Sequence, residues 1–329
     1  MEKGKKENGN GNGGEGTADA KAENTIEVEV EVEASPPQSS QTFDTLVFSG
    51  GHCQTVAFVG CLRWLEECRA REAVRTAAGS SAGAILALMT VMGVTCDEME
   101  QWADRILSSR IHQLDVEAVF ELFENLGLDS GQRLEAYIRD VLWSHTGFRE
   151  ATFAQLHQHA ACEGRRLVVC ASDVAAGMPE YFSVDTSPDV SVVSAIRASM
   201  CIPILFTPVL LGDKMYLDGG MFQNLPTGFL ADGNGGGQGE GETCRPRHFV
   251  ASNVLALNIP WELPTRLPTD LITYVDYVTA SLLFRTNACM QPCLPTDVKL
   301  TTLEIKIPPC DDAGFCASEF EFKIDAPAL

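Results

Sequence analysis

The sequence predicts an α/β protein in which helices cover a sheet, and three observations lead to that class. The 329-residue chain has 45% hydrophobic residues, enough for a substantial core. From Phe43 onward, short apolar runs alternate with longer segments of helical periodicity. A turn of small residues joins one of these runs directly to an apolar segment. Alternation of this kind is typical of a sheet covered by helices.

The short apolar runs are the predicted strands, and each is bounded by polar residues or glycine. In chain order they read TLVFS, AVRTAA, RRLVVCAS, KMYL and HFVASNVLALNI. Helical periodicity predicts helices over residues 55–69, 96–107 and 269–286.

Residues 1–42 are predicted to be a disordered acidic tail, because they carry almost no large apolar side chains that could repay the entropy of ordering. The stretch TIEVEVEVEA has the period of a strand, but one face would be all glutamate, so it would need a sheet edge to pair with. Residues 43–329 are predicted to form one domain, with a flexible glycine-rich loop at about 231–246.

The formal net charge of −21 argues against binding to nucleic acid or to anionic membranes by electrostatic attraction. No uninterrupted apolar stretch approaches the ~18 residues of a spanning helix, and no secretory signal is seen, so we expect a cytoplasmic protein. The 12 cysteines are then expected to be reduced thiols. Four cysteines lie near the C-terminus: Cys289, Cys293, Cys310 and Cys316. Their spacing departs from that of common zinc sites, and we expect no metal there.

The segment GSSAG carries the first candidate site. Gly79, Ser81 and Gly83 fit the Gly-x-Ser-x-Gly pattern of a nucleophile elbow, a sharp strand-to-helix turn that exposes a serine oxygen. Ser80 does not fit that frame. The glycines are needed because a Cβ would obstruct the close contact between strand and helix.

Two further segments end predicted strands with glycine pairs. Gly50 and Gly51 follow TLVFS, and Asp218 ends a strand before Gly219 and Gly220. In an open α/β sheet, functional groups collect outside the carboxyl ends of the strands. We therefore expect both segments to lie near the elbow serine.

These segments resemble the patatin-like phospholipase family in the family's order across about residues 44–260. The motifs are the glycine loop SGGHCQTVAFVG, the elbow GSSAG, the segment IRASMCIPILFTP and the box YLDGGMFQNLP. The resemblance implies a three-layer α/β/α sandwich with a mostly parallel central sheet. It also implies a lipid acyl hydrolase that uses a Ser-Asp dyad, with Ser81 as nucleophile and Asp218 as base. The partner would be a lipid, met at a membrane or droplet surface by a peripheral protein.

The chemistry of the residues agrees with a dyad. A serine hydroxyl needs an adjacent base to take its proton, and burial makes a carboxylate a better base. The backbone amides of Gly50, Gly51 and Ala82 are the predicted oxyanion donors. Water would release the acyl chain, and no cofactor is expected.

Three alternatives accompany this interpretation. Ser81, Asp218 and His248 follow the chain order of an α/β-hydrolase triad, but His248 precedes a strand and is expected at the opposite edge of the sheet. Where the family commonly has a third glycine, a basic residue and another glycine, this chain has His52, Gln54 and Thr55, so His52 is a possible modulator and activity is weakened or lost in the alternative. Arg197 either contacts a substrate phosphate or, as we favour, lies on a solvated helix face.

Overall fold

A computed structural model describes the chain over most of its predicted domain. The described residues are 26–27, 42–108, 122, 124–231, 251–260, 274, 278, 294–295, 297–305 and 320–321. Several predictions lie outside them: the tail apart from residues 26–27 and 42, the glycine-rich loop apart from residue 231, the helix at 269–286 apart from residues 274 and 278, and His248.

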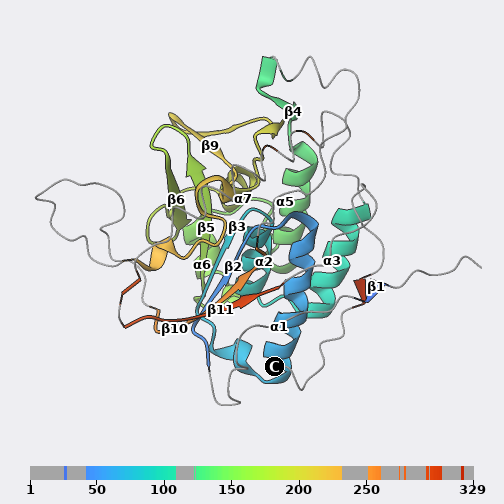
Figure 1. Cartoon of the computed structure of the whole chain (residues 1–329), viewed down its shortest axis with the longest axis vertical. Helices are drawn as coiled ribbons and strands as arrows, with labels where there is room; N and C mark the ends of the chain where they lie inside the picture. Colours follow the sequence, from blue (N-terminus) through green and yellow to red (C-terminus); the bar gives the residue numbers. More distant parts are fainter. Residues whose placement is uncertain are drawn as a thin grey trace, which may run out of the picture.

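The centre of the described fold is an eight-stranded sheet (Figure 1). Its order is β11-β10-β2-β3-β5-β9-β8, and β6 also pairs with β5. The first five of these strands are parallel, whereas β6, β9 and β8 join antiparallel. The strands are β2 (Thr45–Phe48), β3 (Thr76–Ser80), β5 (Arg166–Asp173), β6 (Met178–Ser183), β8 (Val209–Leu211), β9 (Lys214–Leu217), β10 (Asn253–Asn258) and β11 (Lys299–Glu304).

Two small strand pairs lie apart from this sheet. β4 (Gly127–Asp129) pairs in parallel with β7 (Ile204–Phe206), and β1 (Ile26–Glu27) pairs in parallel with β12 (Phe320–Glu321).

Helices follow the strands, as the alternation predicts. They are α1 (Ala57–Glu67), α2 (Ala82–Val91), α3 (Cys96–Ser108), α5 (Gln132–Thr146), α6 (Phe153–Gln158), α7 (Val192–Ser199) and α8 (Gly220–Gln223), with 3₁₀ turns η1 (His52–Val56), η2 (Ala70–Ala73), η3 (Ala160–Cys162) and η4 (Gly228–Leu230). The predictions of helices at 55–69 and 96–107 are confirmed by α1 and α3. In the described part of the chain, no helix has the length and apolar character needed to cross a membrane.

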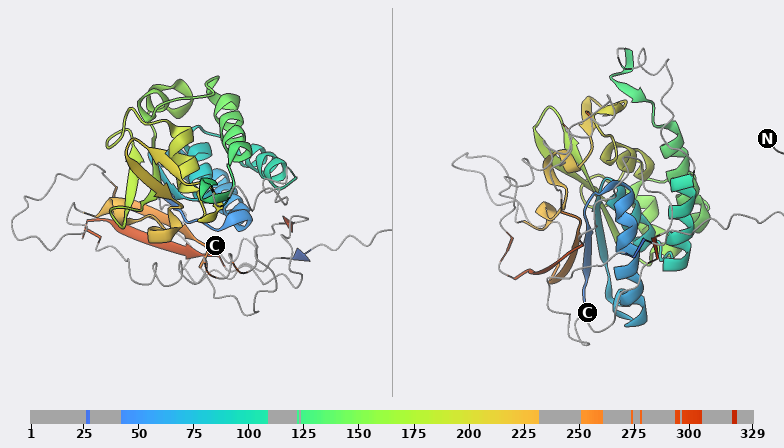
Figure 2. Two further views of the ribbon diagram at one scale, coloured as in Figure 1. Left: turned by 90° about the horizontal axis from the view of Figure 1, so that it is seen from above. Right: turned by 45° about the vertical axis from the view of Figure 1, so that its right-hand side comes forward.

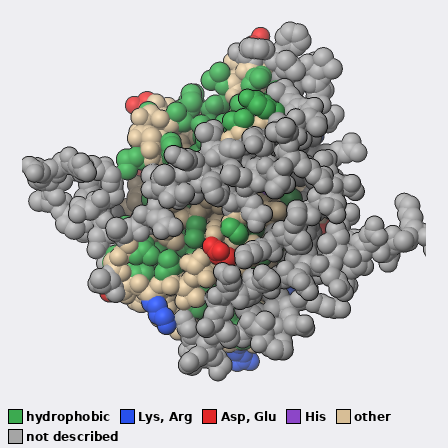
Figure 3. Space-filling model, viewed as in Figure 1, with side chains coloured by type: hydrophobic (Ala, Val, Ile, Leu, Met, Phe, Trp, Pro, Cys, Tyr) green, Lys and Arg blue, Asp and Glu red, His purple; other side chains and the backbone are tan. Residues whose placement is uncertain are grey.

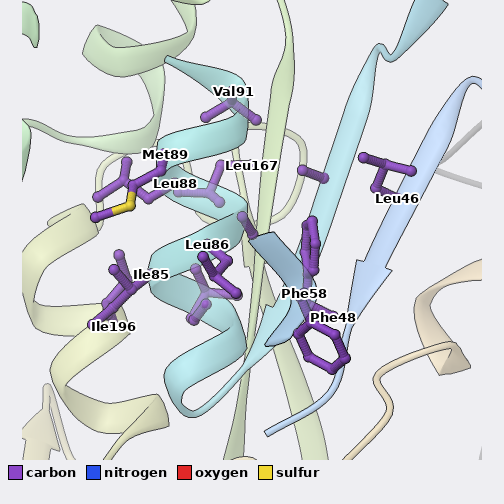
Figure 4. Packing of buried hydrophobic residues seen from close by; sticks show 14 of the residues in the cluster. Leu46, Phe48, Phe58, Ile85, Leu86, Leu88, Met89, Val91, Leu167 and Ile196 are labelled. Atoms are coloured by element: carbon purple, nitrogen blue, oxygen red, sulfur yellow. The ribbon is translucent and has the colours of Figure 1, made fainter. Parts of the chain in front are cut away.

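The sheet buries side chains on both of its faces, because successive residues of a strand point to opposite sides. In β2, Leu46 and Phe48 join the large core beneath the main helices, and Val47 joins a second core on the other face. The main helices lie together on one face of the sheet (Figure 2), and Figure 4 shows apolar residues of α1, α2 and α7 meeting those of the strands. Phe229 and Leu230 of η4 contribute to the second core. The predicted α/β class with a mostly parallel central sheet is thus confirmed.

Helix α2 is the element that matters most for the site. Nine of its residues are buried, from Gly83 to Val91, so the helix lies inside the main core and not on its surface. Burial on all sides stabilises a helix whose sequence AGAILALMTV offers no polar face. The residue before it, Ser81, is therefore held between a buried strand and a buried helix.

Candidate active site

Ser81 occupies the sharp turn between β3 and α2. Its backbone angles, φ 52° and ψ −130°, are in a region that residues other than glycine rarely adopt. The chain reverses so closely that a Cβ on Gly79 would lie 2.2 Å from the Gly83 carbonyl oxygen, and one on Gly83 would lie 2.5 Å from the Ser49 carbonyl oxygen. The tight turn therefore leaves no room for a Cβ at either glycine.

Asp218 lies against the serine. The Ser81 hydroxyl donates a hydrogen bond to Asp218 Oδ2 at 2.7 Å, across 137 residues of sequence. The other carboxylate oxygen accepts from the Gly220 N–H at 2.8 Å. Ser81 is 8% exposed and Asp218 is 5% exposed, so bulk water does not separate the two groups. The structure brings together the two residues predicted as nucleophile and base.

The Asp-Gly-Gly turn reaches this position because it approaches β5 closely. A Cβ on Gly219 would lie 2.2 Å from the Cys170 carbonyl oxygen. The backbone of the turn is also tied down: the Asp218 N–H donates to the Cys201 carbonyl at 2.8 Å, and the Ser172 hydroxyl donates to the Asp218 carbonyl at 2.8 Å. Such ties fix the carboxylate in place before any substrate binds.

Burial raises the pKa of Asp218 to about 7. Desolvation is the main cause, and the hydrogen bonds from Ser81 and Gly220 partly oppose it by stabilising the anion. The neighbouring thiols of Cys170 and Cys201 have pKa values that burial raises, so they are neutral at pH 7. A carboxylate with a pKa near 7 is well matched to accept a proton at neutral pH.

The glycine loop differs from its predicted role at one position. The Gly50 N–H donates to the Asn224 carbonyl oxygen at 3.2 Å, and Asn224 Nδ2 donates to the Gly50 carbonyl at 3.2 Å. Because its amide is committed to Asn224, Gly50 is not placed as an oxyanion donor in this structure. The Gly50–Asn224 contact is non-local, and the sequence pattern gave no sign of it.

Two predicted donors remain near Ser81. Ala82 is the first residue of α2, so its N–H has no carbonyl partner four residues earlier within the helix. Gly51 immediately precedes η1, and no hydrogen bond of its N–H is found among the described residues.

His52 begins η1 with a left-handed backbone, φ 52°. The ring is partly buried, and desolvation lowers its pKa, so the neutral form is favoured at pH 7. Thr55, another substituted position of the turn, closes it by donating its hydroxyl to the His52 carbonyl at 2.8 Å. The substituted loop is thus an ordered turn beside Gly51.

Arg197 does not lie on a solvated helix face, and our prediction for it is wrong. The side chain is 5% exposed and its Nη2 donates to the carbonyls of Ser130 and Thr207 at 3.0 and 3.2 Å. The guanidinium lies 4.8 Å from the ring centroid of Phe206. Arg197 therefore joins α7 to the β4–β7 pair.

Ser199 is the residue that the sequence analysis missed. Its hydroxyl oxygen accepts the N–H of Ser81 at 2.8 Å, across 118 residues. Ser199 stands in the segment IRASMCIP, but its neighbours in sequence do not show that it faces the elbow.

Among the described residues, no group of His, Cys, Asp or Glu side chains is arranged to hold a metal ion.

The site thus consists of a serine on a strained elbow of an α/β sheet, hydrogen-bonded to a buried aspartate. The model of one family, described as patatin-like phospholipase, matches residues 46–231, more than half of the chain. The chain belongs to the patatin-like phospholipase family.

Sequence relatives come from viruses and bacteria. The chain is 25% identical over 195 residues to an uncharacterized protein of Acanthamoeba polyphaga mimivirus, covering 59% of this chain and 63% of the relative. It is 24% identical over 186 residues to a probable lipid hydrolase of Invertebrate iridescent virus 6, covering 56% and 62%. It is 31% identical over 197 residues to the uncharacterized protein YqhO of Bacillus subtilis, covering 55% and 64%. In each case the match spans less than two thirds of the relative.

Two bacterial proteins of known structure match this chain with low TM-scores. VipD of Legionella pneumophila matches with a TM-score of 0.41 and 16% identity, over 71% of this chain and 54% of VipD. ExoU of Pseudomonas aeruginosa, solved in complex with SpcU, matches with a TM-score of 0.40 and 16% identity, over 80% of this chain and 57% of that chain.

Proposed function

We propose that this protein is a lipid acyl hydrolase that cleaves fatty acyl esters of phospholipids or related glycerolipids through an acyl-serine intermediate. The observation that carries the proposal is the 2.7 Å hydrogen bond from Ser81, on its strained elbow, to the buried carboxylate of Asp218. Membership of the patatin-like phospholipase family supports the lipid substrate.

In the first half-reaction, Asp218 Oδ2 accepts the Ser81 hydroxyl proton while Ser81 Oγ bonds to the ester carbonyl carbon. The N–H groups of Gly51 and Ala82 stabilise the negative carbonyl oxygen. The tetrahedral intermediate collapses, the bond to the alcohol oxygen breaks, and Asp218 returns the proton to that oxygen. The products are the free alcohol and an ester of Ser81.

In the second half-reaction, water takes the place of the alcohol. The water oxygen bonds to the acyl carbon while Asp218 accepts a proton from that water. Asp218 then returns the proton to Ser81 Oγ as the bond between Ser81 Oγ and the acyl carbon breaks. The fatty acid leaves, and the enzyme regains its starting state.

The surface near the carboxyl edge of the sheet supports an encounter with lipid. Leu126, Ile204 and Leu210 are exposed by 58%, 41% and 66%, on or beside β4, β7 and β8. Figure 3 shows hydrophobic side chains gathered around these elements at the top of the molecule. Because the net charge of −21 opposes attraction to anionic headgroups, contact with a membrane or droplet would depend on such apolar side chains.

A catalytically weakened lipid-binding or protein-binding module is the second candidate, and the Gly50 amide favours it. That amide donates to the Asn224 carbonyl oxygen, so the site has one oxyanion donor fewer than the sequence predicts. Losing one such donor typically lowers turnover by about 10²–10³-fold.

Labelling and turnover separate the two candidates. A fluorophosphonate probe should label the wild type and Ser80→Ala but not Ser81→Ala. Hydrolysis of nitrophenyl acyl esters and of phosphatidylcholine vesicles should follow the same pattern, because Ser81 Oγ is hydrogen-bonded to Asp218, whereas Ser80 Oγ has no hydrogen-bond partner among the described residues. An unlabelled wild type that still binds fatty acyl vesicles would identify the binding module instead.

A further inference from the structure

Ser199, the last residue of α7, contacts both Ser81 and the residue that follows Asp218. Its side chain accepts the N–H of Ser81 at 2.8 Å, and its backbone carbonyl accepts the N–H of Gly219 at 3.0 Å. The residue has no exposed surface. The elbow and the Asp-Gly-Gly turn are thus attached to the same buried residue.

We propose that Ser199 is a positioning residue that sets the distance between Ser81 and Asp218. The proposal rests on the function proposed above and adds to it a residue outside the reacting pair.

The direction of the Ser199 hydrogen bonds follows from simple donor and acceptor accounting. The Ser199 hydroxyl also lies 2.5 Å from the Cys170 carbonyl oxygen, which can only accept. The hydroxyl proton therefore points to Cys170, and an oxygen lone pair faces the Ser81 N–H. One hydroxyl satisfies two buried backbone groups, the N–H of Ser81 in the elbow and the carbonyl of Cys170 on β5.

The Ser81 N–H needs this acceptor because of the elbow itself. At φ 52° the amide of Ser81 has left the ladder of β3, and a buried N–H without an acceptor is unfavourable. Without Ser199 Oγ, the peptide before Ser81 would turn toward another acceptor, and Ser81 Oγ would turn with it. The 2.7 Å contact to Asp218 would then lengthen.

Helix α7 gives Ser199 a fixed place. Seven of its eight residues, including Ser199, are buried. At its end, the Cys201 carbonyl accepts the Asp218 N–H at 2.8 Å, so the same chain segment also holds the aspartate. A small rotation of the elbow would therefore not be followed by the base.

Three variants test the role of the hydroxyl. Ser199→Ala removes it, Ser199→Cys keeps the volume but offers only a weak donor and acceptor, and Ser199→Thr retains it. We expect kcat on a soluble nitrophenyl ester to fall by about 10- to 100-fold in the first two with KM little changed, because misplacement of reacting groups by ~1 Å has costs of this size. Ser199→Thr should retain most of the wild-type kcat.

Ser191→Ala is the matched control, because it makes the same chemical change at the other end of α7. The Ser191 hydroxyl accepts from Ser194 N–H at 3.3 Å and donates to Glu150 at 2.9 Å. Its loss should lower the unfolding midpoint and leave kcat unchanged. A fall in kcat as large as that of Ser199→Ala would show a general loss of stability and overturn the proposal.

The pH profile distinguishes positioning from a structural defect. The titratable groups that interact electrostatically with Asp218 are the thiols of Cys170 and Cys201, and both are neutral at pH 7. The hydrogen bond from Ser81 lowers the pKa of Asp218, so a looser contact should raise that pKa and move the acid limb of kcat to higher pH. Ser199→Ala and Ser199→Cys should show this shift, and Ser199→Thr and Ser191→Ala should not.

Amide hydrogen exchange of the peptide over residues 76–84 tests the contact without turnover. Exchange should be faster in Ser199→Ala than in the wild type, and Ser199→Thr should restore the wild-type rate. A wild type that neither reacts with fluorophosphonate nor hydrolyses any ester would refute the proposed function, and the exchange result would still decide whether Ser199 holds the elbow. Unchanged kcat and unchanged exchange in Ser199→Ala and Ser199→Cys would overturn the proposal.

Discussion

Asp218 combines two properties that oppose each other in a folded protein. As a buried carboxylate with a pKa of about 7, it is a good proton acceptor, but its charged form is disfavoured by desolvation. Its ordinary pKa in an unfolded chain is about 3.9, so the folded state binds the proton more tightly between pH 4 and 7. The contribution of this group to stability is therefore fully present below pH 4 and is lost as the pH rises to 7.

This sign gives a prediction for Asp218→Asn. The variant should lose nearly all hydrolysis, yet its free energy of unfolding should exceed that of the wild type at pH 8, by about 1–4 kcal/mol, since each pKa unit corresponds to about 1.4 kcal/mol. At pH 4 the difference should nearly vanish. Urea unfolding at both pH values measures it, and a variant less stable than the wild type at pH 8 would contradict the assigned burial effect.

Ser81 carries a backbone conformation that favours glycine. Ser81→Gly should therefore raise the free energy of unfolding by about 1 kcal/mol, because strained backbone angles have costs of about 1–3 kcal/mol each. Ser81→Ala, which keeps the Cβ, should show no such gain. Thermal unfolding of the two variants provides the comparison, and equal midpoints would show that the turn is not strained.

At the scale of single elements, a pattern that is contiguous in sequence predicts local structure, whereas a contact between distant segments leaves no such pattern. The spacing of Gly79, Ser81 and Gly83 predicts the elbow because the strand, turn and helix are contiguous in sequence. The contacts of Gly50 with Asn224 and of Ser81 with Ser199 join segments far apart in the chain, so no local pattern reports them. The burial of Arg197 likewise depends on β4 and β7, which the sequence analysis did not identify.

In the proposed mechanism, the turn η1 sets the position of the Gly51 N–H, an expected oxyanion donor. We predict that His52→Gly raises turnover of short acyl esters, because glycine adopts the left-handed conformation of position 52 without strain and leaves the adjacent Gly51 peptide freer to rotate. Gly51→Ala should lower turnover, because its Cβ would lie 3.0 Å from Ile259 Cδ1 and crowd the turn that carries the Gly51 amide.

If His52 has a catalytic role, His52→Gly should lower turnover instead of raising it. Its removal would then lower the rate and remove a pH dependence below its ordinary pKa of about 6.5, since burial lowers the pKa of His52. The pH–rate profiles of the wild type and His52→Gly, measured with the same soluble ester, separate the two outcomes.

At the scale of the whole molecule, lipid contact and ester cleavage should be separable. Leu210→Asp places a charge on β8, where the leucine is 66% exposed. We expect weaker sedimentation with phosphatidylcholine vesicles and slower hydrolysis of vesicle lipid, with unchanged hydrolysis of a soluble short ester. Arg149→Ala, at an exposed site on the loop after α5, is the control and should alter neither. If both variants bind vesicles equally well, β8 is not part of the surface that contacts lipid.

The acidic tail is predicted to be dispensable for stability. Deleting residues 1–40 removes nine acidic residues and four lysines, and should change the free energy of unfolding by roughly 0.5 kcal/mol or less. The deletion also removes β1, but a two-residue strand pair contributes little by itself. Binding to anionic vesicles should improve slightly at low salt. A large loss of stability would show that the tail belongs to the folded domain.

The strand order has a consequence for synthesis of the protein. β2 is the first strand of the main sheet to be made, and one of its two neighbours is β10. Asp44, which precedes β2, accepts hydrogen bonds from Ser252 and Asn253, the former 208 residues later. Until β10 leaves the ribosome, β2 is an apolar edge strand, and such edges promote aggregation. The nascent chain therefore has to keep this edge covered for most of its translation, and we expect its yield in the cell to depend on chaperones that hold unfinished chains.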